Sequence, residues 1–184
     1  MAIVTPDISA GELKLFELLP KIKVVFDVGA RTDLEYYKIR PNCEYHLFEP
    51  NPEFVESLIE QAKDIPNIQI NAFGLGDVEG MYQYNYGQQM FLGGEGTAVT
   101  GNIELPIKTL DWYCKERNIK QIDFLKIDTE GYDYKVLLGA TETIPKCRFI
   151  QYEHWNDKEE FVRLLSDKFA MLEMGGRNVF CIRK

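Results

Sequence analysis

The feature of this chain that most constrains its fold is the alternation of short apolar runs with longer amphipathic segments. Apolar runs of this length are typical of β-strands buried on both faces, and the segments between them have the spacing of helices with one apolar face. An alternating order of strands and helices predicts a parallel sheet that is covered by helices on both sides. The pattern therefore indicates a doubly wound α/β fold.

Seven segments are predicted to be strands and five to be helices. The strands are predicted at Lys23–Val28, Glu44–Phe48, Ile68–Phe73, Ile122–Asp128, Phe149–Glu153, Met171–Met174 and Val179–Ile182. The helices are predicted at Leu34–Ile39, Pro52–Lys63, Thr109–Arg117, Tyr132–Thr143 and Asp157–Lys168. Asn51, Thr109 and Asp157 are expected N-caps, because such side chains accept hydrogen bonds from the free backbone N–H groups of a helix start.

Two stretches interrupt the alternation. Residues 80–101 are rich in Gly, Tyr, Gln and Thr, and three of the tyrosines alternate as in a strand, which predicts a hairpin and a mobile loop that could cover a site. Residues 175–177 join the last two predicted strands too closely for a crossover, so these strands are predicted to pair antiparallel. We expect a single domain over residues 1–184, with a seven-stranded, mostly parallel sheet, a C-terminal antiparallel hairpin and an insertion at about residues 80–101.

The charge of the chain limits its partners. It has 184 residues and a formal net charge of −8 at pH 7, with 21 Lys and Arg against 29 Asp and Glu. Nucleic-acid binding needs a basic face, so this composition argues against a nucleic-acid partner. No apolar run approaches the ~20 residues of a membrane span, and the first residues lack the pattern of a signal peptide. We therefore expect a cytoplasmic protein that does not bind a membrane.

The cysteines and carboxylates give no metal-site pattern. The chain contains four cysteines, Cys43, Cys114, Cys147 and Cys181. None belongs to a C-x-x-C pair, so we expect free thiols in a reducing compartment, without a zinc site or a redox dithiol. Asp128 and Glu153 could hold a divalent cation with waters, but their spacing is not diagnostic, and no metal is predicted.

Acidic residues gather at the ends of the predicted strands. Ligands of doubly wound sheets bind at the carboxyl ends of the strands, so side chains at these ends are the candidates for a site. The residues there are Asp27, Glu49, Asp77, Asp128, Glu153 and His154. The expected site is therefore lined mainly by carboxylates.

The loop after the first predicted strand, residues 26–33, contains one glycine, Gly29. A dinucleotide loop needs several glycines so that backbone N–H groups can approach a pyrophosphate, which disfavours a nicotinamide dehydrogenase. The carboxylate of Asp27 suits a ligand with a cation, such as the α-amino group of a methionine moiety, and Arg31 could meet its carboxylate. Glu49 could accept both hydroxyl groups of a ribose. This combination points to S-adenosylmethionine.

At these residues the sequence resembles the FkbM-type class I methyltransferases. The resemblance rests on residues 25–30 (VFDVGA), 48–51 (FEPN) and 109–111 (TLD), and above all on residues 122–131 (IDFLKIDTEG), which VLLGA follows. The matching blocks span about residues 24–153. The resemblance implies a Rossmann-like fold and S-adenosylmethionine as methyl donor. It also implies methylation of a hydroxyl on a sugar, a glycoconjugate or a polyketide-like small molecule.

The resemblance also implies roles for individual residues. The implied cofactor site consists of Asp27, Gly29, Ala30, Arg31, Glu49 and Asp77. Within it, Glu49 would meet the ribose and Asp77 the adenine amino group. Asp128 and His154 are the candidate bases for the acceptor's proton, and Glu130 would face the methyl group beside Asp128.

Two positions depart from the pattern of the family. Arg31 stands where an Asn is common and Asp33 where a Gly is common. Their side chains could form a local pair that shapes the turn, or they could compete with the cofactor for it. A degenerate, non-catalytic methyltransferase-like binding domain is therefore the alternative to an enzyme that acts on a small-molecule or carbohydrate acceptor.

Overall fold

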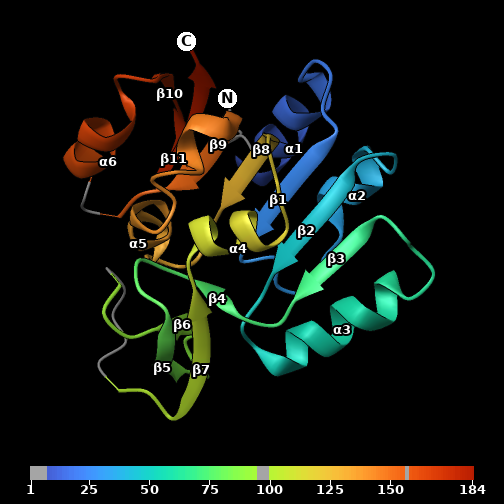
Figure 1. Ribbon diagram of the computed structural model, residues 1–184, viewed down its shortest axis with the longest axis vertical. Coiled ribbons are helices and arrows are strands. Elements are labelled where there is room, and N and C mark those ends of the chain that lie inside the picture. The colour runs from blue at the N-terminus through green and yellow to red at the C-terminus, as the bar shows by residue number, and fades with distance from the viewer. Residues whose placement is uncertain (1–7, 95–99, 156–157) are drawn as a thin grey trace, which may run out of the picture.

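A seven-stranded sheet forms the centre of the structure, in the order β10-β11-β9-β8-β1-β2-β3 (Figure 1). The computed structural model describes residues 8–94, 100–155 and 158–184. The strands of this sheet are β1 (Val24–Val28), β2 (Glu44–Phe48), β3 (Ile68–Asn71), β8 (Ile122–Ile127), β9 (Cys147–Glu153), β10 (Phe169–Gly175) and β11 (Asn178–Arg183). The first five run parallel, whereas β11 pairs antiparallel with both β9 and β10. The predicted sheet is thus confirmed.

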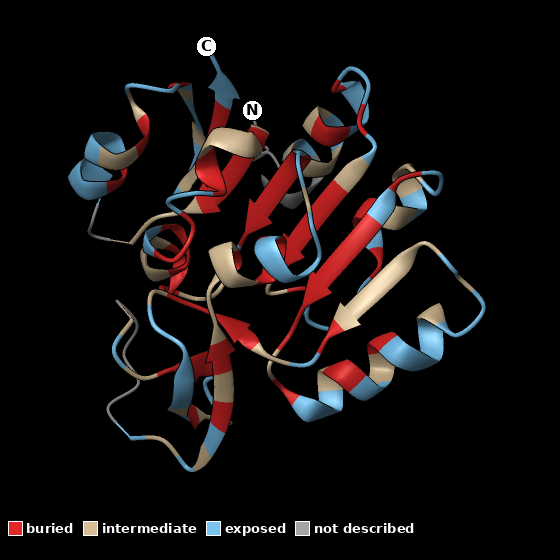
Figure 2. Ribbon diagram, in the orientation of Figure 1, coloured by how far each residue is buried: buried red, intermediate tan, exposed pale blue. Residues whose placement is uncertain are grey.

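Apolar side chains cover both faces of this sheet. Strand β8 is buried over its whole length, as are most residues of its neighbours (Figure 2). Successive side chains of β8 lie on opposite faces of the sheet, since Phe124 belongs to one hydrophobic cluster and Leu125 to the other. Side chains of a strand alternate in this way, and burial on both sides explains why the sequence has a continuous apolar run there.

Helices pack on both clusters. They are α1 (Ile8–Leu18), α2 (Glu35–Ile39), α3 (Pro52–Ala62), α4 (Leu110–Glu116), α5 (Asp133–Leu138) and α6 (Lys158–Leu165), with a 3₁₀ helix, η1, at Ile144–Lys146. The side chain of Asn51 accepts a hydrogen bond from the Glu53 N–H (3.0 Å) and so caps α3 as predicted. The side chain of Thr109 accepts from the Trp112 N–H (3.1 Å) and caps α4. The third predicted cap, Asp157, lies outside the described residues.

One predicted helix is too long. The prediction runs over Tyr132–Thr143, but α5 ends at Leu138. At the next residue, Gly139, the backbone passes so close to Gly76 that an added Cβ would lie 1.9 Å from the Gly76 carbonyl oxygen. A glycine that permits this contact ends the helix, and sequence periodicity does not reveal such a contact in advance.

The predicted strand Ile68–Phe73 is also too long, because β3 ends at Asn71. There the Phe73 N–H donates back to the Asn71 carbonyl (3.0 Å), and the chain leaves the main sheet. The backbone then enters a different sheet at Gly74. The sequence pattern of residues 68–73 therefore does not reveal that the chain leaves one sheet and enters another.

Helix α1 has no counterpart among the predicted elements. Its Phe16 ring packs against the rings of Tyr36 (5.0 Å between centroids) and Phe124 (4.9 Å). Arg40 donates hydrogen bonds to backbone carbonyls at the end of the helix, at Glu17 and just beyond it. These contacts fix α1 against α2 and the main sheet.

A second, four-stranded sheet lies beside the carboxyl ends of the main strands (Figure 1). Its strands are β4 (Gly74–Leu75), β5 (Gly80–Asn85), β6 (Met90–Phe91) and β7 (Ile103–Lys108), in the order β4-β7-β5-β6. Strands β5 and β6 pair antiparallel. The loop expected to be mobile includes residues 95–99, which lie outside the described residues. The sheet therefore places the β5–β6 hairpin over the edge where ligands of such folds bind.

The cysteines are buried and carry free thiols, as predicted. Burial raises the pKa of Cys181 to about 12, which keeps that thiol protonated. Among the helices of the described residues, none is long and apolar enough to cross a membrane.

Candidate functional site

Two cavities meet at the carboxyl edge of the main sheet. The first, here called the hairpin cavity, has about 540 Å³ of space, including open solvent, and lies between the ends of β1, β2 and β8 and the β5–β6 hairpin. The second, here called the helix cavity, has about 900 Å³ counted in the same way and is lined from α1, α2 and the loop after β1. Gly29, Arg31 and Asp128 line both cavities. One long ligand could therefore occupy both at once.

At the junction of the two cavities, the absence of a side chain at Gly29 allows the loop after β1 to approach the end of β8. The φ of Gly29 is +78°, and an added Cβ would lie 1.9 Å from the Asp128 carbonyl oxygen. The N–H groups of Gly29 and Ala30 both donate to the Phe48 carbonyl (3.0 and 3.3 Å). The loop after β1 is thus hydrogen-bonded to the end of β2, and its glycine packs against the end of β8. Only the position of Gly29 lies this close to β8, so the loop needs a glycine at that position alone.

Glu49 presents a buried carboxylate to the hairpin cavity. Its side chain accepts hydrogen bonds from the backbone N–H groups of Arg31 and Asn51, both at 2.9 Å, and the residue is 3% exposed. Burial raises the pKa of Glu49, and the two N–H donors oppose this change. Each oxygen accepts one of these bonds and keeps further lone-pair capacity, so the carboxylate can accept two hydroxyl groups of a ligand.

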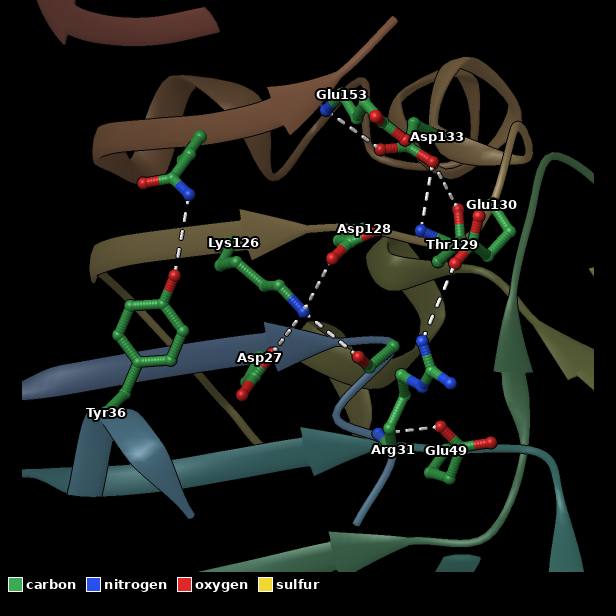
Figure 3. Close-up of polar contacts among 12 residues, drawn as sticks. Asp27, Arg31, Tyr36, Glu49, Lys126, Asp128, Thr129, Glu130, Asp133 and Glu153 are labelled. Carbon is green, nitrogen blue, oxygen red and sulfur yellow. Dashed lines mark hydrogen bonds and ion pairs between the residues drawn. The ribbon is translucent and has the colours of Figure 1, made fainter. Parts of the chain in front are cut away.

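The side chain of Arg31 points towards Glu130 in the loop after β8 (Figure 3). Its guanidinium donates to the Gln89 side-chain oxygen (2.8 Å) and lies 3.7 Å from a carboxylate oxygen of Glu130. Asp33 instead bonds to Lys38 (3.4 Å). Arg31 and Asp33 therefore have different partners and do not form the local pair considered from the sequence.

Lys126 is a site residue that the sequence reasoning missed. Its ammonium nitrogen lies 3.0 Å from the Asp27 carboxylate and 3.7 Å from that of Asp128, and it donates to the Gly29 carbonyl (3.0 Å) (Figure 3). Burial opposes its charge, but the two carboxylates outweigh burial and raise the pKa of Lys126. The sequence feature that could have indicated Lys126 is a lysine within an otherwise apolar strand, two residues before an aspartate.

Asp133 braces the loop that carries Asp128 and Glu130. It is buried and accepts hydrogen bonds from the Thr129 N–H (3.0 Å), the Thr129 hydroxyl (2.6 Å) and the Glu153 N–H (3.1 Å) (Figure 3). Burial, more than the charge of Asp128, raises the pKa of Asp133 to about 7. This carboxyl group joins the ends of β8 and β9, a link that the sequence does not display.

Two of the predicted site residues lie outside both cavities. Asp77 follows β4 and faces Lys135, with 4.0 Å between the charged atoms. His154 follows β9, and its N–H donates to the Arg177 carbonyl (3.0 Å). The neighbouring Glu153 carboxylate lies 3.0 Å from the Arg177 side chain. No group of three metal-ligating side chains occurs within the described residues.

The other predicted residues come together around the two cavities. Asp27 and Ala30 line the helix cavity, and Glu49 and Glu130 line the hairpin cavity. The three shared residues complete the set. The helix cavity also receives Glu12 from α1, which the sequence reasoning did not consider.

Comparisons with known proteins identify the family of the chain. A family model described as the methyltransferase FkbM domain matches residues 27–175. The 2-O-methyltransferase NoeI of Sinorhizobium fredii is 23% identical, with 74% of this chain and 64% of NoeI covered. The hexuronic acid methyltransferase AglP of Haloferax volcanii is 23% identical, with 83% of this chain and 65% of AglP covered. The chain thus spans slightly less than two thirds of the length of these curated relatives.

A solved structure gives the same result for the fold. The crystal structure of methyltransferase FkbM from Methylobacillus flagellatus superposes with a TM-score of 0.62 at 13% identity. The superposition covers 89% of this chain and 45% of the other. At this level of identity the likeness concerns the fold.

Proposed function

This protein belongs to the FkbM methyltransferase family, whose members depend on S-adenosylmethionine, and on that premise we propose that it methylates a hydroxyl group of a carbohydrate. The observation that carries the proposal is the position of Glu49. Its buried carboxylate ends β2 in the wall of a cavity that continues past Gly29 to Asp128.

The residues of the hairpin cavity fit the adenosine part of this cofactor. Phe48, Leu75 and Phe91 supply apolar walls for a purine, and Glu49 supplies acceptors for a ribose diol. The methionine part would then enter the helix cavity, where Asp27, Ala30 and the other residues of the β1 loop form the wall. We also propose that Asp77 accepts a hydrogen bond from the amino group at the edge of the purine.

Asp128 is our proposed base. When bound, S-adenosylmethionine supplies a methyl group on a positively charged sulfur. The acceptor hydroxyl must lose its proton as its oxygen forms the new bond, and a carboxylate at the junction of the cavities can take that proton. The Asp128 side chain is 48% exposed, so an acceptor can reach it. Glu130 faces the same space, and we propose His154 for contacts with the acceptor outside the cavities.

The relatives support the choice of acceptor. One is a 2-O-methyltransferase, which supports transfer to oxygen, and the other acts on a hexuronic acid, which supports a carbohydrate. We therefore propose the acceptor as a class, the carbohydrates.

The second candidate is a methyltransferase-like domain that binds the cofactor without turnover. It is favoured by Arg31, whose contacts with Gln89 and Glu130 span the junction where an acceptor would approach. The same assay separates the two candidates.

The assay supplies S-adenosylmethionine with a labelled methyl group and a panel of sugars, uronic acids and oligosaccharides. We expect label in at least one acceptor. Asp128→Asn should abolish transfer while S-adenosylhomocysteine still binds, and Asp167→Asn, an exposed change, should leave transfer intact. Binding without transfer to any acceptor would favour the second candidate, and full activity of Asp128→Asn would remove Asp128 as the base.

A further inference from the structure

Glu12 lies outside the part of the chain that the family model matches, because the match begins at residue 27. It nevertheless lines the helix cavity together with Asp27, Tyr36 and Asp128. Helix α1 holds it there, since Phe16 of the same helix packs on two rings of the core. Its place in the cavity wall is thus fixed by buried contacts.

The carboxylates of the helix cavity differ in their partners. Asp27 lies 3.0 Å from the Lys126 ammonium, which also approaches Asp128 at 3.7 Å. Asp33 bonds to Lys38. Within the described part of the chain, Glu12 forms no ion pair. Among the carboxylates of this wall in the described residues, only Glu12 and Glu35 form no ion pair, and Glu35 is exposed whereas Glu12 is half-buried.

The surroundings of Glu12 favour an incoming cation. Burial raises its pKa to about 7, and the charges of Asp128 and Glu153 act in the same direction. Lys126 and a hydrogen bond from Gln151 act against them. A half-buried carboxylate among other acids is stabilised in its charged form by a ligand that brings a positive group.

We propose that Glu12 receives the α-ammonium group at the amino-acid end of the cofactor. The inference rests on the proposed function, because Glu49 as the ribose acceptor in the hairpin cavity leaves the helix cavity for the opposite end of the same molecule. Asp27 forms the back of this cavity, and Lys126 balances its charge. In this proposal Glu12 of α1 takes the role at the ammonium group that the sequence analysis gave to Asp27.

Three ligands without a transferable methyl group test this assignment by calorimetry. S-Adenosylhomocysteine carries the complete amino-acid end, its deaminated analogue lacks the ammonium group, and 5′-methylthioadenosine lacks the whole amino-acid end. We compare the wild type with Glu12→Gln, which keeps the shape of the side chain and removes its charge. Glu17→Gln is the matched control, because Glu17 lies on the exposed side of the same helix.

Glu12→Gln should weaken S-adenosylhomocysteine about tenfold or more, as expected when a charge-assisted hydrogen bond is lost. It should change the affinities of the other two ligands by less than about twofold, and Glu17→Gln should change none of the three. An equal change for all three ligands, or no change for S-adenosylhomocysteine, would overturn the assignment alone. A wild type that binds none of the ligands would overturn the proposed function and this inference with it.

Discussion

Lys126 links three strand-end groups through one buried ammonium group. Removing it leaves Asp27 buried without its counter-charge. We expect Lys126→Met to lower the free energy of unfolding by about 3–5 kcal/mol, the usual result when one partner of a buried pair is removed. Urea denaturation followed by circular dichroism measures this change.

The double variant Asp27→Asn/Lys126→Met is the control for this prediction. Because it removes both charges, it should recover a large part of the lost stability relative to Lys126→Met. Additive losses from the two single changes would show that the pair does not interact as the geometry indicates.

At the scale of residues, the sequence indicated some of the side chains that line the two cavities and missed others. Glu49 and Asp128 were indicated because each follows an apolar strand, and the ends of such strands meet at one edge of a parallel sheet. Lys126 was missed because its role depends on Asp27 of the neighbouring strand. Glu12 was missed because its helix was not recognised.

The tight crossing at Gly29 gives a prediction for the loop after β1. Gly29→Ala would force a Cβ against the Asp128 carbonyl at a backbone angle that favours glycine. We expect a lower thermal midpoint and a large loss of S-adenosylhomocysteine binding, because both cavities share this residue.

Gly11→Ala is the matched glycine substitution. Gly11 lies within α1, is exposed, and has no atom within 4 Å of an added Cβ. Alanine there should raise the free energy of unfolding by roughly 0.5–1 kcal/mol through helix propensity. A similar response to both substitutions would contradict the close contact seen at Gly29.

Asp133 gives a prediction for the connection between β8, α5 and β9. Asp133→Ala would leave the partly buried N–H groups of Thr129 and Glu153 without their acceptor. We expect a loss of about 1–3 kcal/mol in the free energy of unfolding, measured by chemical denaturation. The exposed change Asp167→Ala should stay within about 0.5 kcal/mol of the wild type.

At the scale of elements, strands with strong apolar runs were predicted almost to the residue, as at β2 and β8. Burial on two faces produces that pattern directly. The second sheet was not predicted as a sheet, because β4 and β6 are two residues long and β7 pairs with strands distant in sequence. Helix α1 was not predicted, and its position depends on tertiary contacts such as those of Phe16 with Tyr36 and Phe124.

The stability of the whole molecule should depend on pH through Asp133. Its pKa is raised to about 7 in the folded state, from an ordinary value of 3.8, so the folded protein binds the proton more tightly than the unfolded chain. Its contribution is complete below about pH 4 and is lost as the pH rises through 7. One such group changes the free energy of unfolding by at most about 1.4 kcal/mol per pH unit.

Denaturation of the wild type and Asp133→Asn at pH values from 5 to 8 measures this slope. In the variant, the free energy of unfolding should fall less steeply with rising pH than in the wild type, because an amide does not titrate. Glu12 acts in the same direction with a smaller effect, since it is only half-buried. Equal slopes in the two proteins would contradict the protonation assigned to Asp133.

At the scale of the whole molecule, the seven-stranded, mostly parallel sheet with its C-terminal antiparallel hairpin and the family followed from the sequence, and the shape of the site did not. The cavities are formed where α1 and the β5–β6 hairpin meet the strand ends. Helix α1 was not predicted from the sequence, and a hairpin within residues 80–101 was predicted without its place in a second sheet. In the proposed function the acceptor approaches this same part of the surface, so the sequence specifies the acceptor less closely than the cofactor.

Calorimetric titration of S-adenosylhomocysteine into the wild type and Glu49→Ala tests whether the two cavities form a cofactor site that depends on Glu49. We expect saturable binding to the wild type below millimolar concentration and its loss in Glu49→Ala. Glu60→Ala, an exposed change on α3, should bind like the wild type. The absence of wild-type binding at millimolar ligand would exclude a cofactor site in these cavities, and equal binding by Glu49→Ala would exclude Glu49 as a cofactor contact.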